Sequence, residues 1–195
     1  LACLSACMVV TDEESSPYGR IGIAVPAKTV DLSQWQAPQQ LGEFSLQGSL
    51  NSKEQDLHLF RYVHPARPAD ILELAVYPLP GGWEDLAPIR VVEGHFPQPR
   101  EAEMQRLMRH SQADVREILH DSQSDPSLRY PIAISEMRAV RIDRPLGSVL
   151  MLTADLPVFL RLRLETDDPA PAQQIPALRQ MLLDFRAALA RHGGS

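Results

Sequence analysis

The chain has 195 residues, 44% of them apolar, and a formal net charge of −6. This length supports one domain with a hydrophobic core, and the acidic balance argues against a nucleic-acid-binding protein. The sequence contains no run of about 18 apolar residues, so no transmembrane helix is expected. Its two cysteines, Cys3 and Cys7, precede the expected fold, which argues against a thiolate zinc site or a disulfide framework in the body.

The first residues, "LACLSAC", are apolar and small, as at the end of a secretory signal peptide. Leu4-Ser5-Ala6-Cys7 resembles the lipobox of bacterial lipoproteins, in which the cysteine thiol is lipidated after export. The resemblance implies that Cys7 is the lipidation site. Lipidation of Cys3, or an exported tail without lipid, is the alternative.

The residues that follow Cys7 fit the same interpretation. Residues 11–16 are acidic and Ser-containing, which suits a flexible tether. We therefore expect residues 1–18 to hold a signal-peptide remnant, the lipidation site and a tether, and residues 19–195 to form a single globular domain. The resemblance, with Met8 after the cysteine, implies the periplasmic side of the outer membrane; a soluble periplasmic protein is the alternative.

The first half of the body has the alternating and β-branched patterns of strands. Strands are predicted over residues 20–25, 41–48, 56–64 and 69–79. In the third of these, His58, Phe60 and Tyr62 should face one way and Leu57, Leu59 and Val63 the other. The glycine- and proline-rich residues 80–88 are expected to form a loop.

The second half is expected to begin with a helix, from Pro99 to about Asp121. Its apolar residues recur at spacings of three and four: Met104, Leu107, Met108, Val115, Ile118 and Leu119. Three strands over residues 129–142, 147–154 and 157–165 follow. A closing helix is predicted over residues 175–191.

Together these elements predict an α+β fold: an antiparallel sheet of about five to seven strands with two main helices packed on it. This order is similar to that of the Mog1/PsbP-like α/β sandwich, over about residues 41–192. The resemblance implies a binding or assembly module without catalysis, although a fold alone does not define a function.

The sequence contains no G-x-S-x-G elbow, P-loop, Rossmann glycine fingerprint or H-E-x-x-H, and neither a cofactor nor a metal is expected. His110, Asp114 and Glu117 fall on one face of the predicted helix and could bind a divalent ion. A solvated helix face with Arg106 and Arg109 nearby is the simpler interpretation. His58 and His64 are interpreted as ordinary surface or half-buried histidines.

Two surfaces are candidate contacts. One is the loop residues Trp83, Glu84 and Asp85, for which no partner acid or base is evident in the sequence. The other is a possible face for an anionic partner, formed by arginines of the last strands: Arg138, Arg141, Arg161 and Arg163, with Arg129 and Arg144 nearby. Guanidinium groups suit carboxylate or phosphate recognition. The alternative is a solvated face balanced by Glu136, Asp143 and Glu165.

These features predict an envelope lipoprotein of a Gram-negative bacterium that acts as a binding or assembly module. Its expected partners are the membrane, through the lipid on Cys7, and an envelope protein or an anionic envelope component. A periplasmic hydrolase with dispersed catalytic residues, or a carrier of a small apolar ligand, is the alternative. A pocket with converging titratable groups favours the hydrolase, and a large apolar cavity favours the carrier.

Overall fold

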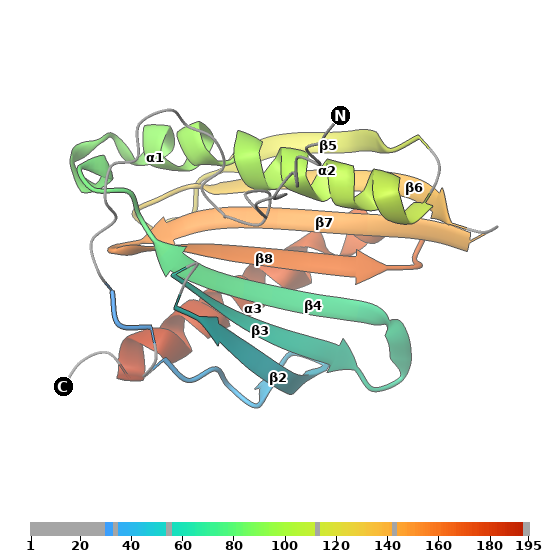
Figure 1. The fold of residues 1–195 in the computed structure, drawn as a ribbon, viewed down its shortest axis with the longest axis horizontal. Coiled ribbons are helices and arrows are strands. Elements are labelled where there is room, and N and C mark those ends of the chain that lie inside the picture. The colour runs from blue at the N-terminus through green and yellow to red at the C-terminus, as the bar shows by residue number, and fades with distance from the viewer. Residues whose placement is uncertain (1–29, 33–34, 54–55, 112–113, 142–143, 193–195) are drawn as a thin grey trace, which may run out of the picture.

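A computed structural model describes residues 30–32, 35–53, 56–111, 114–141 and 144–192 (Figure 1). In this part of the chain an eight-stranded antiparallel sheet has the order β1-β2-β3-β4-β8-β7-β6-β5. The strands are β1 (Gln40–Leu41), β2 (Phe44–Ser52), β3 (Leu57–His64), β4 (Arg67–Pro78), β5 (Arg116–Gln123), β6 (Ile132–Arg141), β7 (Arg144–Asp155) and β8 (Val158–Thr166). The helices are η2 (Trp83–Asp85), α1 (Pro88–His95), α2 (Pro97–Ser111), η3 (Pro171–Gln174) and α3 (Ile175–His192).

The predicted α+β class with an antiparallel sheet is confirmed, and the strand count is higher than expected. The predicted strand over residues 20–25 lies outside the described residues. The strand predicted over residues 41–48 is divided by a turn into β1 and β2, the remaining predicted strands appear, and α3 begins at the predicted residue. Among the described helices, none is both long and apolar enough to cross a membrane.

The helix predicted from Pro99 to Asp121 is wrong in its second half. Helix α2 ends at Ser111, and Arg116–Gln123 is the edge strand β5, paired with β6. Ile118, expected on the buried helical stripe, is 52% exposed. Over a segment as short as residues 116–123, apolar residues spaced by three and four fit a helix and a strand equally well. Pairing with β6 makes this segment a strand.

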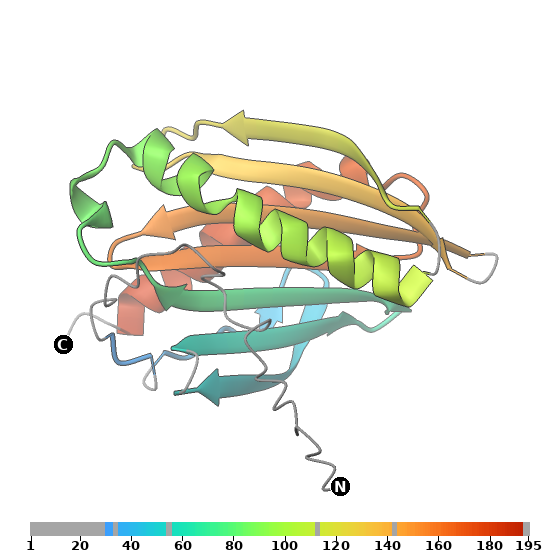
Figure 2. The same cartoon turned by 45° about the horizontal axis from the view of Figure 1, so that its top comes forward.

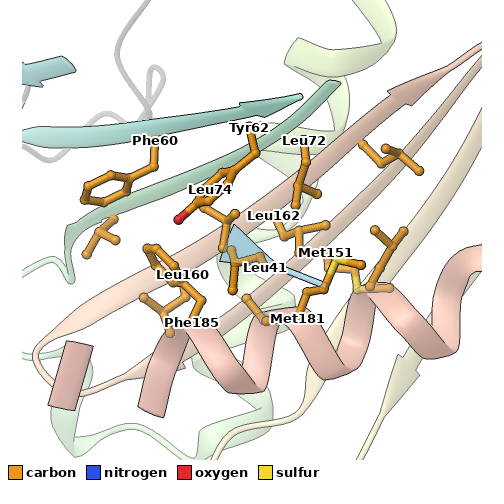
Figure 3. Packing of buried hydrophobic residues seen from close by; sticks show 14 of the residues in the cluster. Leu41, Phe60, Tyr62, Leu72, Leu74, Met151, Leu160, Leu162, Met181 and Phe185 are labelled. Atoms are coloured by element: carbon orange, nitrogen blue, oxygen red, sulfur yellow. The ribbon is translucent and has the colours of Figure 1, made fainter. Parts of the chain in front are cut away.

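Helix α3 packs on one face of the sheet and encloses the larger core (Figure 3). Tyr62, Leu74 and Leu162 point toward it from the strands, and Phe185 and Met181 point back from the helix. In β3 the predicted division of the two faces is confirmed, because His58, Phe60 and Tyr62 are buried here. Each fully buried Leu or Phe side chain contributes about 1.5–3 kcal/mol to folding.

A tight turn between β1 and β2 brings this edge of the sheet against α3. Gly42 has a φ of 54°, which a glycine adopts without strain. A Cβ placed there would lie 2.6 Å from the Met181 Cε. The positive φ therefore favours glycine in this turn, and a larger residue would also require the flexible end of the Met181 side chain to move.

Helices α1 and α2 lie on the opposite face, over the half of the sheet that contains β5, β6 and β7 (Figures 1 and 2). Val91, Val92 and Phe96 pack on Leu152 and Phe159 of the sheet. A smaller cluster joins Leu107 of α2 to Met137 and Leu146. Among the candidate site residues, Arg161, Arg163 and Trp83 lie on this face.

Candidate binding surface

Arg161 and Arg163 lie on the face of the sheet that α1 and α2 cover. Strand register places Arg161 beside Ala75 and Leu152, and Arg163 beside Glu73 and Leu150. Side chains paired across neighbouring strands point to the same face. The two arginines therefore share one face, as the alternation in the sequence indicated.

Arg163 is held by three carboxylates. Its Nη2 donates to Glu73 Oε2, and its Nη1 lies 3.5 Å from Glu103 Oε2 and 3.7 Å from Glu165 Oε2. The side chain is only 13% exposed. An anionic partner would have to displace these carboxylates, so Arg163 is better described as a structural residue than as an open anion site.

Helix α2 joins this network through Glu103 and Arg106. Arg106 donates to both Glu103 oxygens at 2.8 Å and to Glu165 Oε2 at 2.7 Å, and the Ser148 hydroxyl donates to Glu103 Oε1 at 2.6 Å. Burial by itself raises the pKa of Glu103, but the bonds from Arg106, the charges of Arg163 and Arg106, and the Ser148 hydroxyl outweigh it and hold that pKa below its usual value. The network therefore fixes α2 on the sheet.

The other two predicted arginines do not join this surface. Glu136 is paired in register with Val149, which belongs to the α3 core, so Glu136 and Arg138 lie on the α3 face. Arg138 Nε donates to the buried Glu136 carboxylate at 2.6 Å. Arg141 ends β6 opposite Arg144, and its side chain is outside the described part of the structure. Arg138 is paired with Glu136 and Arg163 lies near Glu165, two of the acidic residues in the balanced-face alternative, but Arg163 is not solvated and also binds Glu73 and Glu103.

The predicted contact loop is the short helix η2, anchored by an aromatic cluster. Gly82 precedes it with a φ of 84°, a conformation that favours glycine. The Trp83 ring meets His95 and Phe159 edge-on, with ring centroids 6.2 Å apart in both pairs. His95 stacks on Phe159 at 4.3 Å, and its Nε2 lies 3.0 Å from the Tyr77 hydroxyl.

The polar groups of this cluster are kept neutral. Burial, followed by the nearby positive charge of Arg161, lowers the pKa of His95 to about 3. Burial also raises the pKa of the Tyr77 hydroxyl, while Arg161 acts in the opposite direction. The fold therefore brings Arg161 and the Trp83 loop, which are far apart in sequence, to the same end of the sheet.

Beside this cluster, two large apolar side chains reach solvent. Leu86 is 41% exposed and Ile89 is 42% exposed, and Asp85 next to them is also exposed. Glu84 is half-buried. Sequence reasoning missed Leu86 and Ile89, although apolar residues in a proline-rich loop are a usable signal for contact residues. The loop and the start of α1 thus present apolar side chains beside a packed aromatic cluster.

The metal-binding alternative finds no support in the described residues. Glu117 lies in β5 and binds Arg100 Nη1 at 2.8 Å and the Ser135 hydroxyl at 2.6 Å, so it does not share a helix face with Asp114. The described residues contain no group of three or more potential ligands.

The two strand β3 histidines are buried, at 5% and 7% exposure, and not at the surface or half-buried as expected, and both have structural partners. His58 Nδ1 lies 3.0 Å from the Leu32 carbonyl oxygen. His64 Nδ1 accepts hydrogen bonds from the backbone N–H groups of Ala66 and Arg67 at 3.1 Å, so its ring proton is on Nε2, which donates to Glu43. His64 therefore holds the β3–β4 hairpin.

A cleft of about 570 Å³ opens at the ends of β4, β7 and β8. Its lining mixes apolar and charged residues: Ala69, Ile71, Arg144, Pro145, Leu146, Glu165, Thr166 and Asp167. The Glu165 carboxylate is already bound by Arg106 at 2.7 Å. The mixed lining of this cleft is also unlike the large apolar cavity expected of a carrier of a small apolar ligand. Cys7, the predicted lipidation site, lies outside the described residues.

Neither the known protein families nor the curated proteins contain a match to this chain. Among solved structures, the chain is similar to the cyanobacterial PsbP protein of Synechocystis, at 10% identity and a TM-score of 0.47, covering 86% of this chain and 94% of that one. It is also similar to a Pseudomonas aeruginosa protein of unknown function, at 12% identity and a TM-score of 0.38, covering 71% and 93%.

Proposed function

We propose that this protein is a binding or assembly module of a Gram-negative envelope, without catalysis, held at the periplasmic side of the outer membrane by a lipid on Cys7. Its contact surface for an envelope protein is the loop and helix start formed by Trp83, Asp85, Leu86 and Ile89. This set is called the η2 surface below.

The exposure of Leu86 and Ile89 carries the proposal. Large apolar side chains at the surface contribute binding energy when a partner covers them. The aromatic cluster beneath keeps the loop in one conformation, so little entropy is lost on binding. The exposed carboxylate of Asp85 supplies a polar rim that favours a partner with a cationic group.

The pairing of the charged groups supports binding over catalysis. Glu103 and Glu165 are paired with Arg106 and Arg163 between α2 and the sheet. A general acid or base must be able to exchange its proton with a substrate, which such ion pairs oppose.

Docking is tested by cross-linking the intact protein in its native envelope and identifying the partner. We expect Leu86→Glu and Ile89→Glu to lower partner recovery at least about tenfold, because each buries a charge in an apolar contact. Met108→Glu on α2, where the native side chain is 45% exposed, is the matched control and should leave recovery unchanged. Equal recovery with all three variants rejects the η2 surface.

The anchor is tested separately by mass spectrometry of the protein extracted from its native membrane. The proposal expects an acylated amino-terminal Cys7, loss of the lipid and of membrane retention in Cys7→Ser, and no effect of Cys3→Ser. An unmodified Cys7 in the native protein rules out the anchor and leaves the docking test unaffected.

A further inference from the structure

At one margin of the sheet the outermost strand is the two-residue strand β1, which leaves most of the outer side of β2 open within the described residues (Figures 1 and 2). On that side β1 pairs only with Phe44 and Ser45, and the Leu46 N–H donates to the Gln39 carbonyl at 2.9 Å. Beyond Leu46, the residues from 47 to 51 are all exposed. Their outward backbone groups are able to pair with another strand.

The composition of this margin differs from that of the opposite one. Strand β5 carries Arg116, Glu117, His120 and Asp121 and a bulge, which are devices that discourage edge-to-edge pairing. Strand β2 contains neither a charged residue nor a proline. Its bulge lies between Leu46 and Gly48, at the end already occupied by β1, and leaves the rest of the strand regular.

The open part of β2 is complementary to itself. Gly48 pairs with Arg61 of β3 and Leu50 pairs with Leu59, so both lie on the face that carries α1 and α2. Leu50 is 59% exposed, the highest value among the exposed large apolar residues. A Cβ added to Gly48 would meet no atom within 4 Å, so open space lies beside this glycine.

We infer that a second copy of this chain pairs antiparallel with β2, about a twofold axis at Ser49. In this register Leu50 of each copy lies opposite Gly48 of the other and fills the open space beside it. The ladder joins only uncharged residues, so no like charges meet. The twofold axis produces two Leu50–Gly48 contacts, and a strand from an unrelated protein would not in general provide both.

The contact is short, because the open stretch covers only residues 47–51. An interface of this size falls below the roughly 1,200 Å² of standard stable complexes, so the dimer is weak and forms at high protein concentration. This inference does not depend on the η2 surface or on the lipid anchor.

Disulfide trapping tests the register in the full chain with Cys3→Ser and Cys7→Ser, which removes every other thiol. Opposite residues of an antiparallel pair have Cα atoms about 4.5–5.5 Å apart, within reach of a disulfide. Ser49→Cys therefore should cross-link rapidly. Asn51→Cys should not, since the two Asn51 positions lie four residues apart along the ladder, about 13 Å. Ile118→Cys on β5, 52% exposed in the native chain, controls for random collisions.

Sedimentation velocity over a concentration series gives a second readout without added thiols. We expect a concentration-dependent dimer that Leu50→Lys weakens at least about tenfold, because it places a cation against the partner strand. Ile118→Lys should sediment like the parent. Failure of Ser49→Cys to cross-link, as expected if another segment or protein occupies this margin, overturns the inference. Equal cross-linking of the three cysteine variants also overturns it.

Discussion

Glu103 is the buried carboxylate through which α2 is fixed to the sheet, and its charge can be removed without changing its shape. It accepts bonds from Arg106 and Ser148 and faces Arg163. Glu103→Gln keeps one oxygen for these donors but loses the charge and turns an NH₂ group toward a guanidinium. Breaking a buried ion pair costs about 3–5 kcal/mol.

We expect a loss near the lower bound, about 3 kcal/mol, because Arg163 keeps Glu73 and Glu165 as partners. For a chain of this size, that corresponds to a fall of about 6–12 °C in Tm. Urea and thermal unfolding followed by circular dichroism measure both quantities. The control is Glu101→Gln, an exposed residue on the same helix that accepts a bond from Gln105, and it should change stability by less than about 0.5 kcal/mol.

The pH dependence of stability distinguishes the effect of the Glu103 charge from the effect of its packing. Because the folded-state pKa of Glu103 lies below its unfolded value, its charge stabilises the fold above the unfolded pKa, and this contribution is lost as the pH falls through the folded pKa. The stability gap between the parent and Glu103→Gln should therefore narrow between pH 7 and pH 3. A gap that is the same at both pH values, or no larger than that of Glu101→Gln, refutes this reasoning.

Three further predictions concern stability and are measured by the same unfolding assays. The pKa of His95 is lowered to about 3, so this residue must stay neutral in the fold. Its contribution should lower the free energy of unfolding by about 1.4 kcal/mol per pH unit as the pH falls from about 6.5 to about 3, and His95→Gln should remove this contribution. Leu162→Ala, in the α3 core, should cost about 2–5 kcal/mol, whereas Leu50→Ala at the sheet margin should cost less than about 0.5 kcal/mol in monomer stability. Gly147→Ala should cost about 1–3 kcal/mol, because the new Cβ lies 2.9 Å from the Pro171 ring; Gly48→Ala, with open space around it, should cost less. Equal losses of stability for Leu162→Ala and Leu50→Ala, or for Gly147→Ala and Gly48→Ala, contradict the packing argument. A pH dependence of stability that is the same in His95→Gln and in the parent contradicts the His95 prediction.

The fold was predictable from the sequence where one periodicity dominated. Strands β3 and β8 alternate in hydrophobicity, and α3 has an apolar stripe at helical spacing. In each of these elements the pattern identifies both the type of element and its buried side. Strand β5 was not predictable, because an edge strand with exposed Ile118 buries no complete face. Its pairing with β6 is a tertiary contact that leaves little trace in the local pattern.

The candidate site shows the same division. The alternation of β8 places Arg161 and Arg163 on one face, and this follows from the two-residue period of a strand. The two-residue period does not show which charged residues these arginines contact. Glu73 is 90 positions away from Arg163 and Glu103 is 60 positions away. Their contacts depend on how β4 and α2 dock.

The sequence by itself determined the α+β class, the shared face of the β8 arginines and the lipobox resemblance at Cys7, because these are local features of composition and period. Only the tertiary structure decided that β4 neighbours β8, that Arg138 lies on the sheet face that α3 covers, and that Arg163 is paired with Glu73, Glu103 and Glu165. The physical reason is that pairing and docking between distant segments depend on the mutual burial of whole faces, and no single segment specifies that burial.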